Sequence, residues 1–307
     1  MKLTPQARIW WNGELVPWEK AQVHVLTHAL HYATSVFEGI RAYATPRGPA
    51  IFRLDEHVER LFMSCKIVRL PLRFTPAQIR AAILDTVRAN RQEACYIRPL
   101  VFRGYGALGV LPDECPVDVA IASFPWVKKD EAALLEQGVD VGISSWRRIA
   151  PDTLPAMAKC AANYVNSALA VAEAKQRGFH EAILLDFDGL VSEGSGQNVF
   201  VVHKKKLLTP PIGSSILAGV TRASVLQLAT DLGVTAVEER LPREMLYTAD
   251  EAFFTGTVAE LTPIRSVDGL AVGDGRRGPV TKLLQERFFA IARGQAEDPH
   301  GWLTPVA

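Results

Sequence analysis

The sequence predicts an α+β protein built from antiparallel hairpins with interspersed helices. Short turn signals such as Asn12-Gly13 and Asp188-Gly189 separate runs of apolar and β-branched residues, which is the pattern of hairpin strands. Helical patterns lie between the hairpins and do not follow every strand, so a doubly wound parallel sheet is not expected. The length of 307 residues is sufficient for two domains.

The first half of the chain is expected to hold two hairpins, two helices and a final pair of strands. Asn12-Gly13 forms the first turn, and the Pro-Arg-Gly-Pro run at 46–49 forms the second. Asp55 is expected to cap the first helix, and Thr75-Pro76 to begin the next. In order, the expected elements are strands 9–11, 14–17, 35–43 and 50–52, helices 55–67 and 76–90, and strands 95–102 and 117–124.

The second half is expected to combine short hairpins with longer helices. A proline-rich loop at 151–155 precedes an alanine-rich helix that runs from Lys159 to Arg177, where Gly178 ends it. Asp188-Gly189 then forms the turn of a hairpin. In order, the expected elements are strand 139–145, helix 159–177, strands 182–186, 190–193, 199–203 and 206–208, and helices 221–232 and 278–292.

A linker is expected near the middle of the chain. Pro125 is followed by a charged run at 128–131, a composition typical of an exposed connection. We therefore expect a small N-terminal domain at 1–125, an interdomain loop at 126–137 and a larger C-terminal domain at 138–307.

The composition indicates a soluble cytoplasmic protein. The formal net charge is +1, which gives no reason to expect nucleic acid or an anionic membrane as a partner. No apolar run is long enough to span a bilayer, and the N-terminus lacks a hydrophobic signal core. The cysteines are scattered singly, which argues against a disulfide framework or a structural zinc site and fits a reducing compartment: Cys65, Cys95, Cys115 and Cys160.

Two residues in the second half suggest a chemistry. Lys159 lies among small apolar neighbours, and Glu193 lies on a glycine-flanked hairpin strand. A lysine that forms a Schiff base and a carboxylate that keeps a pyridine nitrogen protonated are the two ends of a pyridoxal phosphate (PLP) site. The alternative is that Lys159 merely begins a helix and Glu193 sits on an exposed turn.

Two segments further along could bind the phosphate of this cofactor. Gly219-Val220-Thr221 leads into an expected helix, and the run at 255–260, which contains Thr257, resembles the start of a helix or turn. The free N–H groups of such starts, with the helix dipole and a threonine hydroxyl, suit a dianion. Arg60 offers a charge-assisted partner. The alternative is that each threonine is only an N-cap.

The spacing of these motifs resembles a known family. The pattern Glu193-x-Ser195-x-x-Asn198-Val199-Phe200, continued by Leu207-x-Thr209 and Leu217-x-Gly219-Val220-Thr221-Arg222, resembles the signature of the class IV aminotransferases. Four other runs look like those of the bacterial branched-chain amino acid aminotransferases: Ser35-Val36-Phe37-Glu38-Gly39-Ile40-Arg41, Tyr96-Ile97-Arg98-Pro99, Ser144-Ser145-Trp146 and Ser266-Val267-Asp268-Gly269. The resemblance extends from about Ile9 to the C-terminus.

The resemblance implies a two-domain, fold type IV PLP enzyme similar to D-amino acid aminotransferase. A small N-terminal α/β domain and a larger C-terminal pseudo-barrel domain would hold PLP between them. The implied activity is transamination of L-leucine, L-isoleucine and L-valine with 2-oxoglutarate and L-glutamate, in a ping-pong cycle through a Lys159 Schiff base. The loop at 104–110 would reach into the neighbouring subunit's site, which implies a homodimer that could assemble further.

The resemblance also assigns roles to individual residues. Lys159 would form the Schiff base, Glu193 would pair with the pyridine nitrogen, and Tyr164 would donate a hydrogen bond to the phenolic oxygen of PLP. The residues implied to hold the phosphate are Arg60, Gly219, Val220, Thr221 and Thr257. The residues implied to bind the substrate are Tyr96, with the backbone of Thr257, Val258 and Ala259, for the α-carboxylate; Arg98 for the distal carboxylate of glutamate; and Phe37, Tyr32 and Trp126, with Gly39 and Arg41, around the apolar side chain.

Rival functions of the same fold are a D-amino acid aminotransferase and a PLP lyase of the aminodeoxychorismate lyase type. Those relatives are not expected to share the Tyr96-x-Arg98 pattern. A rival from another class is a silent PLP-binding scaffold protein, which would have no need to keep the Schiff-base lysine together with its three predicted cofactor partners.

Two further motifs are not assigned a site. Gly104-x-Gly106-x-x-Gly109 matches a dinucleotide-binding fingerprint, but Pro112 and Asp113 follow it instead of a helix. His24, His28 and His31 have ligand-like spacing, but no carboxylate or cysteine accompanies them and the residues around them suggest a strand. Structural hydrogen bonding is the expected role of these histidines.

Overall fold

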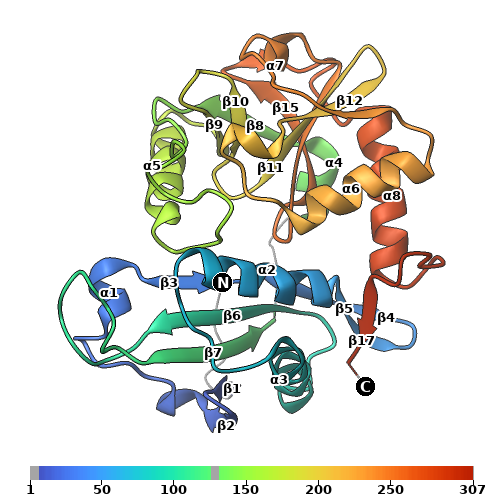
Figure 1. Cartoon of the computed structure of the whole chain (residues 1–307). Coiled ribbons are helices and arrows are strands. Elements are labelled where there is room, and N and C mark those ends of the chain that lie inside the picture. Colours follow the sequence, from blue (N-terminus) through green and yellow to red (C-terminus); the bar gives the residue numbers. More distant parts are fainter. Residues whose placement is uncertain (1–6, 126–130, 307) are drawn as a thin grey trace. The chain divides into compact units, whose positions relative to one another are not determined.

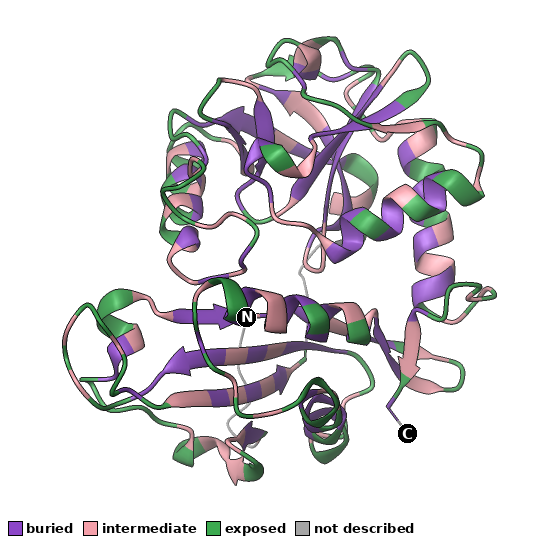
Figure 2. Cartoon of the chain, viewed as in Figure 1, coloured by how far each residue is buried: buried purple, intermediate pink, exposed green. Residues whose placement is uncertain are grey.

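The computed structural model describes residues 7–125 and 131–306, which form two compact units (Figure 1). Unit 1 comprises Met1–Lys128, Ala158–Ala162 and Ala290–Ala307, and unit 2 comprises Lys129–Met157 and Asn163–Phe289. Each unit has its own sheet and helices, and Figure 2 shows buried residues concentrated on the strands of both.

Unit 1 is built on an eight-stranded sheet with the order β17-β5-β4-β6-β7-β1-β2, in which β3 also pairs with β6. The pairings between its described strands are all antiparallel, and the β1–β2 hairpin across Asn12-Gly13 confirms the predicted turn. The strands are β1 (Arg8–Trp11), β2 (Glu14–Pro17), β3 (Ser35–Phe37), β4 (Ile40–Thr45), β5 (Gly48–Phe52), β6 (Cys95–Arg103), β7 (Val117–Phe124) and β17 (Leu303–Pro305).

The strand predicted at 35–43 is divided in two. β3 ends at Phe37 and β4 begins at Ile40, because Glu38 and Gly39 leave the strand geometry. The amide N–H of Phe37 donates to the carbonyl oxygen of Lys159 at 3.0 Å, so this strand pairs with a segment far along the chain.

The helices of unit 1 are η1 (Trp18–Lys20), α1 (His28–Tyr32), α2 (Leu54–Ile67) and α3 (Pro76–Ala89). Thr75 and Gln78 form a reciprocal capping box at the start of α3, which confirms the predicted start. The predicted Asp55 cap of α2 is wrong. That helix begins at Leu54 after Arg53 in the left-handed region at φ 54°, because burial of Leu54 against the core sets the start one residue earlier.

Two segments distant in sequence complete unit 1. Cys160 forms a β-bridge with Val36, and the amide N–H of Ala161 donates to the carbonyl oxygen of Ser35 at 2.9 Å. Near the C-terminus, β17 pairs with β5. The contacts therefore place residues 158–162 and 290–307 with the first unit, whereas the sequence-based boundary assigns both to the C-terminal domain.

Unit 2 is built on a nine-stranded mixed sheet with the order β10-β9-β8-β15-β14-β11-β12-β13, in which β16 also pairs with β15. The predicted β9–β10 and β11–β12 hairpins are confirmed, whereas β13 to β16 were not predicted. The strands are β8 (Val139–Ile143), β9 (Glu181–Leu185), β10 (Val191–Gly194), β11 (Asn198–His203), β12 (Lys206–Thr209), β13 (Ala236–Glu238), β14 (Glu251–Gly256), β15 (Glu260–Val267) and β16 (Leu270–Ala271).

The helices of unit 2 are α4 (Glu131–Gln137), α5 (Asn163–Gln176), η2 (Ile212–Ser214), α6 (Val220–Asp231), α7 (Met245–Thr248) and α8 (Pro279–Ala292), the last of which continues into unit 1. The predicted α6 and α8 are confirmed within a residue. The predicted helix 159–177 begins only at Asn163, because residues 159–161 bond to β3. Helix α4 occupies part of the expected interdomain loop. Among the residues described, no helix has the length and apolar character needed to cross a bilayer.

Candidate active site

The structure gathers the predicted site residues into two sets, one in each unit. Unit 1 carries Tyr32, Phe37, Gly39, Arg41, Arg60, Tyr96, Arg98 and Lys159; unit 2 carries Tyr164, Glu193, Gly219, Val220, Thr221, Thr257, Val258 and Ala259. Trp126, predicted to line the substrate pocket, lies outside the described residues.

Lys159 is held by its backbone between a strand and a helix of unit 1. Its amide N–H donates to Ser64 Oγ on α2 at 3.0 Å, and its carbonyl oxygen accepts from the N–H of Phe37 on β3. The Lys159 Nζ lies 5.0 Å from the centroid of the Phe37 ring. These contacts set the direction of the lysine side chain, which the alternative of an ordinary helix-start lysine does not explain, since α5 begins four residues later.

Tyr96, Gly39 and Arg98 form a second group in unit 1. Tyr96 is buried on β6, and Arg98 Nη2 donates to its hydroxyl at 2.9 Å. A Cβ atom added at Gly39 would lie 2.0 Å from the Tyr96 hydroxyl oxygen, so the glycine leaves room for this phenol. The Arg98 guanidinium lies over the rings of Phe37 and Tyr96, at 4.6 and 5.2 Å. Its buried Nε has no hydrogen-bond acceptor among the described residues.

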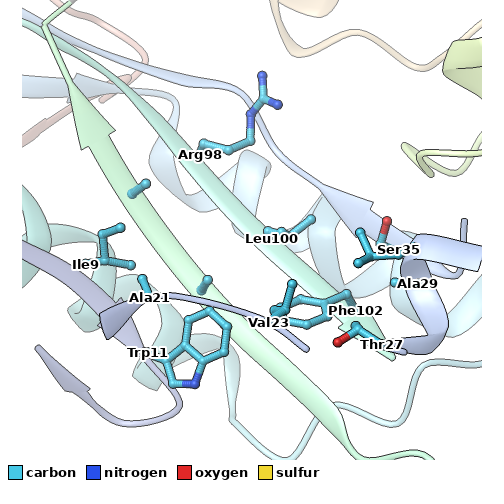
Figure 3. A pocket seen from close by; sticks show the side chains of 13 residues that line it. Ile9, Trp11, Ala21, Val23, Thr27, Ala29, Ser35, Arg98, Leu100 and Phe102 are labelled. Carbon is cyan, nitrogen blue, oxygen red and sulfur yellow. The ribbon is translucent and has the colours of Figure 1, made fainter. Parts of the chain in front are cut away.

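A cavity of about 340 Å³ opens beside Arg98 on the sheet of unit 1 (Figure 3). Trp11, Leu100 and Phe102 supply part of its apolar lining. Figure 3 shows the Arg98 guanidinium pointing away from the Trp11 and Phe102 rings. The predicted wall residues Phe37 and Tyr32 do not line this cavity. The Tyr32 ring lies on α1 against His28, with 4.6 Å between ring centroids, and the Arg41 guanidinium lies over the Tyr43 ring at 5.0 Å.

Arg60 is bound to a carboxylate that sequence reasoning did not assign to the site. Its Nε donates to Glu38 Oε1 at 2.7 Å and its Nη2 donates to Glu38 Oε2 at 2.8 Å, a bidentate and buried pair. His57 Nδ1 lies 2.8 Å from Glu38 Oε2. Burial alone would raise the pKa of Glu38, but the charges and hydrogen bonds of Arg60 and His57 hold that pKa well below its usual range.

The environment of His57 disfavours its protonated form. Burial lowers the pKa of His57 below its ordinary value, and this outweighs the attraction of Glu38. The sequence held a signal for this group: His57 and Arg60 are three residues apart on one helix face, and Glu38 belongs to the Phe37-Glu38-Gly39 motif.

In unit 2, Glu193 lies at an irregular point of β10, where the pairing with β9 shifts register. Its side chain is buried, so the alternative of an exposed turn glutamate is wrong. Glu193 Oε1 lies 2.9 Å from Arg148 Nη2. Glu193 Oε2 accepts from Asn198 Nδ2 and from the backbone N–H of Leu217, each at 3.1 Å.

Arg148 and Asn198 contact the predicted acid, and the sequence analysis assigned a role to neither. Arg148 follows the Ser144-Ser145-Trp146 motif by two positions, and Asn198 belongs to the quoted signature, where it was given no role. Asn198 also connects the acid to α6, because its Oδ1 would lie 2.0 Å from a Cβ atom at Gly219. A buried glutamate requires charged or N–H partners, so a search for such partners near the motifs could have indicated these two residues.

The start of α6 suits an anion. Gly219 is the N-cap residue and no side chain caps the helix, so the first N–H groups have no partner within it. Val220 and Thr221 follow as buried residues. The other predicted phosphate segment is a turn between β14 and β15, since residues 257–259 do not begin a helix. The buried hydroxyl of Thr255 just before this turn has no hydrogen-bond partner in the described structure.

These donors and acceptors fit PLP. A buried carboxylate suits the protonated nitrogen of a pyridine ring, and the uncapped helix start suits its phosphate. Tyr164 lies in the first turn of α5 within the same unit. Unit 1 carries the lysine amine, and unit 2 carries the buried carboxylate and the uncapped helix start, the kinds of group that such a cofactor requires.

The histidine cluster has a structural role. His28 is buried, with Nδ1 2.8 Å from Thr34 Oγ1 and Nε2 2.7 Å from the Gly109 carbonyl oxygen. Residues 23–26 do not form a strand, which corrects the sequence-based expectation. They lead into α1, which begins at His28. The described residues contain no group of three or more histidine, cysteine, aspartate or glutamate side chains placed to hold a metal ion.

Comparisons with known proteins agree over nearly the whole chain. The family model for class IV amino-transferases matches residues 35–267. The branched-chain-amino-acid aminotransferase of Salmonella typhimurium is 50% identical over 299 residues, which cover 97% of both sequences. The crystal structure of the Escherichia coli branched-chain amino acid aminotransferase superposes with a TM-score of 0.96 at 49% identity and covers 98% of this chain and 100% of that one. The Thermobaculum terrenum branched-chain amino acid aminotransferase in its PLP-form has a TM-score of 0.93 at 38% identity, with 100% of both chains covered.

Proposed function

The chain belongs to the class IV aminotransferases, and we propose that it is a branched-chain amino acid aminotransferase that uses PLP. The expected α+β fold class is confirmed with the family. The observation that carries the proposal is 50% identity to a branched-chain enzyme over 97% of the chain, and the buried Glu193 carboxylate with its N–H donors supports it. We propose L-leucine, L-isoleucine and L-valine as amino donors and 2-oxoglutarate as the acceptor.

The residues of both units would hold the cofactor. Bound PLP supplies an electron sink that stabilises negative charge formed at the substrate Cα. Lys159 would bind it covalently through Nζ, and the Glu193 carboxylate would hold a proton on the ring nitrogen. The N–H groups of Val220 and Thr221 would bind the phosphate together with Arg60 and Thr257, as the uncapped α6 start supports.

Lys159 would also move the proton. Once displaced by the substrate amine, its Nζ can accept the Cα proton and later return it, which requires an amine held close to the reacting carbon. The two backbone bonds that hold Lys159 to Ser64 and Phe37 support such positioning.

The substrate groups would contact the Tyr96 and Arg98 pair. The Tyr96 hydroxyl would bind the α-carboxylate with the backbone of residues 257–259, and Arg98 would bind the distal carboxylate of glutamate. The buried Arg98 Nε without an acceptor supports a carboxylate contact at this side chain, and the Phe37 ring beside the guanidinium supports an apolar neighbour for an aliphatic chain.

We further propose a cytoplasmic homodimer. The loop at 104–110 carries apolar side chains that face solvent, such as Tyr105, Leu108 and Val110. This supports insertion of the loop beside a neighbouring subunit. The four cysteines are buried and are present as thiols, which supports a reducing compartment.

The test is the visible absorbance of the purified protein with PLP, recorded before and after adding L-leucine or D-alanine in separate cuvettes. We expect a band that bleaches with L-leucine and not with D-alanine. Bleaching with D-alanine alone would transfer the function to the D-amino acid branch of the family. The Lys159→Ala variant should show neither the band nor turnover, and turnover by that variant would contradict the assignment of the lysine.

A further inference from the structure

We propose that Arg148 is a positioning residue that keeps Glu193 ionised and aligned, so that the shared proton stays on the cofactor's ring nitrogen. This inference rests on the proposed function of Glu193. It adds a residue outside the predicted site, and it explains how a buried carboxylate can remain charged.

The two side chains form a direct and buried ion pair. Arg148 Nη2 lies 2.9 Å from Glu193 Oε1, with 6% and 5% of the respective side chains exposed. Arg148 is itself fixed, because its backbone N–H donates to the Leu185 carbonyl oxygen at 2.8 Å on the neighbouring strand β9. Its Nη1 donates to Asn166 Oδ1 on α5 at 3.4 Å. The backbone of Arg148 is therefore held by a strand, and its guanidinium has one contact to a helix besides its pair with Glu193.

The other contacts of the carboxylate act in the same direction. Oε2 accepts from Asn198 Nδ2 and from the Leu217 N–H, so both oxygens have N–H donors. An adjacent positive charge and donated hydrogen bonds each favour the carboxylate over the neutral acid, whereas burial favours the acid. Arg148 brings a full positive charge to the carboxylate, whereas the Asn198 and Leu217 donors are neutral, so we assign the larger share of this stabilisation to Arg148.

The location of the proton follows from this balance. Glu193 and a pyridine nitrogen share one proton, which resides either on the ring or on the carboxyl group. If Glu193 is stabilised as an anion, the proton lies on the ring. Without the guanidinium, the buried and neutral pair of carboxylic acid and unprotonated pyridine becomes favourable, and the ring can no longer accept electrons effectively.

The experiment loads the full-length protein with PLP labelled with ¹⁵N in the ring and measures the ring-nitrogen chemical shift at neutral pH. Arg148→Gln removes the charge and keeps an N–H donor, while Arg148→Lys keeps the charge. Arg265→Met is a control for loss of an arginine–carboxylate pair, since Arg265 pairs with Asp140 at a more exposed place elsewhere in unit 2. Circular dichroism melting and cofactor absorbance verify that each variant is folded and loaded.

We expect the protonated shift in the wild type, in Arg148→Lys and in the Arg265→Met control, and a shift toward that of a neutral pyridine in Arg148→Gln. A protonated shift in folded, loaded Arg148→Gln would overturn the proposal. Loss of the protonated shift in both Arg148 variants would also overturn it, since charge would then not be the cause. Failure of both Arg148→Gln and Arg148→Lys to fold would show that the pair serves folding instead.

The Glu193→Gln variant tests the role of Arg148 separately from the proposal that Glu193 pairs with the ring nitrogen. The ring nitrogen of PLP bound to this variant should be neutral even though Arg148 is present. If the wild-type nitrogen is not protonated, or if Glu193→Gln leaves it protonated, the assignment of Glu193 to the cofactor fails. If those two results are as expected and Arg148→Gln alone behaves like the wild type, only the role of Arg148 fails.

Discussion

At the scale of single residues, the predicted site groups depend on partners that their own motifs do not reveal. Arg60 is held by Glu38, Glu193 by Arg148, and Tyr96 by Arg98. Each pair joins a charged or hydroxyl group to a planar guanidinium, which fixes direction as well as distance. Small changes at these positions should therefore alter function more than fold.

Gly39→Ala should weaken substrate binding. The new methyl group would lie 2.0 Å from the Tyr96 hydroxyl oxygen, so this phenol must move away from its place beside Arg98. We expect kcat/KM for L-leucine to fall on the order of tenfold or more, measured by steady-state kinetics. Gly213→Ala is the control, because a Cβ atom there has open space. Equal activity of the two variants would contradict the role given to Tyr96.

Arg98→Ala should discriminate between the two kinds of substrate. Glutamate and 2-oxoglutarate carry a distal carboxylate that leucine lacks, and a charged hydrogen bond contributes about 1.5–3 kcal/mol. We expect KM for 2-oxoglutarate to rise about tenfold or more, with a smaller change for L-leucine. Losses of the same size for both substrates would show that Arg98 acts only through Tyr96.

At the scale of elements, some helix starts are capped by residues adjacent in sequence and others by residues distant in sequence. Thr75 caps α3 through residues next to it in sequence, as the capping-box pattern predicts. Helix α8 is capped from a distance: Glu251 on β14 accepts from the N–H groups of Val280 and Thr281 at 2.9 and 2.8 Å. The carboxylate reaches this helix only because a Cβ is missing at Gly278, where it would lie 2.1 Å from Glu251 Cδ.

Glu251→Ala should destabilise unit 2. It removes the acceptor of two helix-start N–H groups and of the Thr281 hydroxyl, which donates at 2.7 Å. We expect a loss of about 2 kcal/mol in the free energy of unfolding, measured by urea denaturation followed by circular dichroism. The exposed Glu239→Ala is the control and should change stability by less than about 0.5 kcal/mol. An unchanged denaturation midpoint for Glu251→Ala would rule out the distant cap.

At the scale of the whole molecule, the chain builds two units from segments that alternate between them. Residues 158–162 belong to unit 1 while the helix that follows them belongs to unit 2, and α8 leads back to unit 1. Lys159 consequently belongs to unit 1 and Glu193 to unit 2.

Acid should destabilise unit 1 through Glu38 and His57. The lowered pKa of Glu38 gives stability that is present above its ordinary value of 4.5 and is lost as the pH falls toward the lowered one. The lowered pKa of His57 means that below its ordinary value of 6.5 the unfolded chain binds a proton that the folded chain does not. Both effects reduce stability on acidification.

Urea midpoints measured from pH 7.5 to pH 4 can separate these two contributions. The wild type should lose stability in two stages, the first starting near the ordinary pKa of histidine, 6.5. His57→Asn keeps a donor toward Glu38 and should lack that first stage while retaining the second. The same pH profile for both proteins would contradict a neutral, buried His57.

Assembly should depend on the apolar loop of unit 1. Val110 and Leu111 are 85% and 74% exposed, which is costly unless another surface covers them. We expect the wild type to sediment as a dimer, and Val110→Asp combined with Leu111→Asp to sediment as a monomer with reduced activity. Leu270→Asp, at an exposed site on β16, is the control. A monomeric wild type would refute the proposed homodimer.

The features that could be predicted from the sequence depend on neighbours along the chain. The Asn12-Gly13 and Asp188-Gly189 turns, the capping box at Thr75, the end of α5 near Gly178 and the bounds of α6 follow from local backbone preferences and from side chains a few positions apart. The aminotransferase signature likewise pointed to Lys159 and Glu193, because their chemistry is carried by residue type and spacing.

Distant contacts decided the rest. The strand at 35–43 is divided at Glu38 and Gly39, and its first part ends at Phe37, which bonds to Lys159 more than one hundred residues away. The same bond takes the lysine into unit 1, where a linear division of the chain does not place it. Strands β13 to β16 and the partners Glu38, Arg148 and Glu251 also escaped prediction. A buried carboxylate must have a partner, but which partner it has depends on how the chain folds in space, since local preferences act over only a few residues.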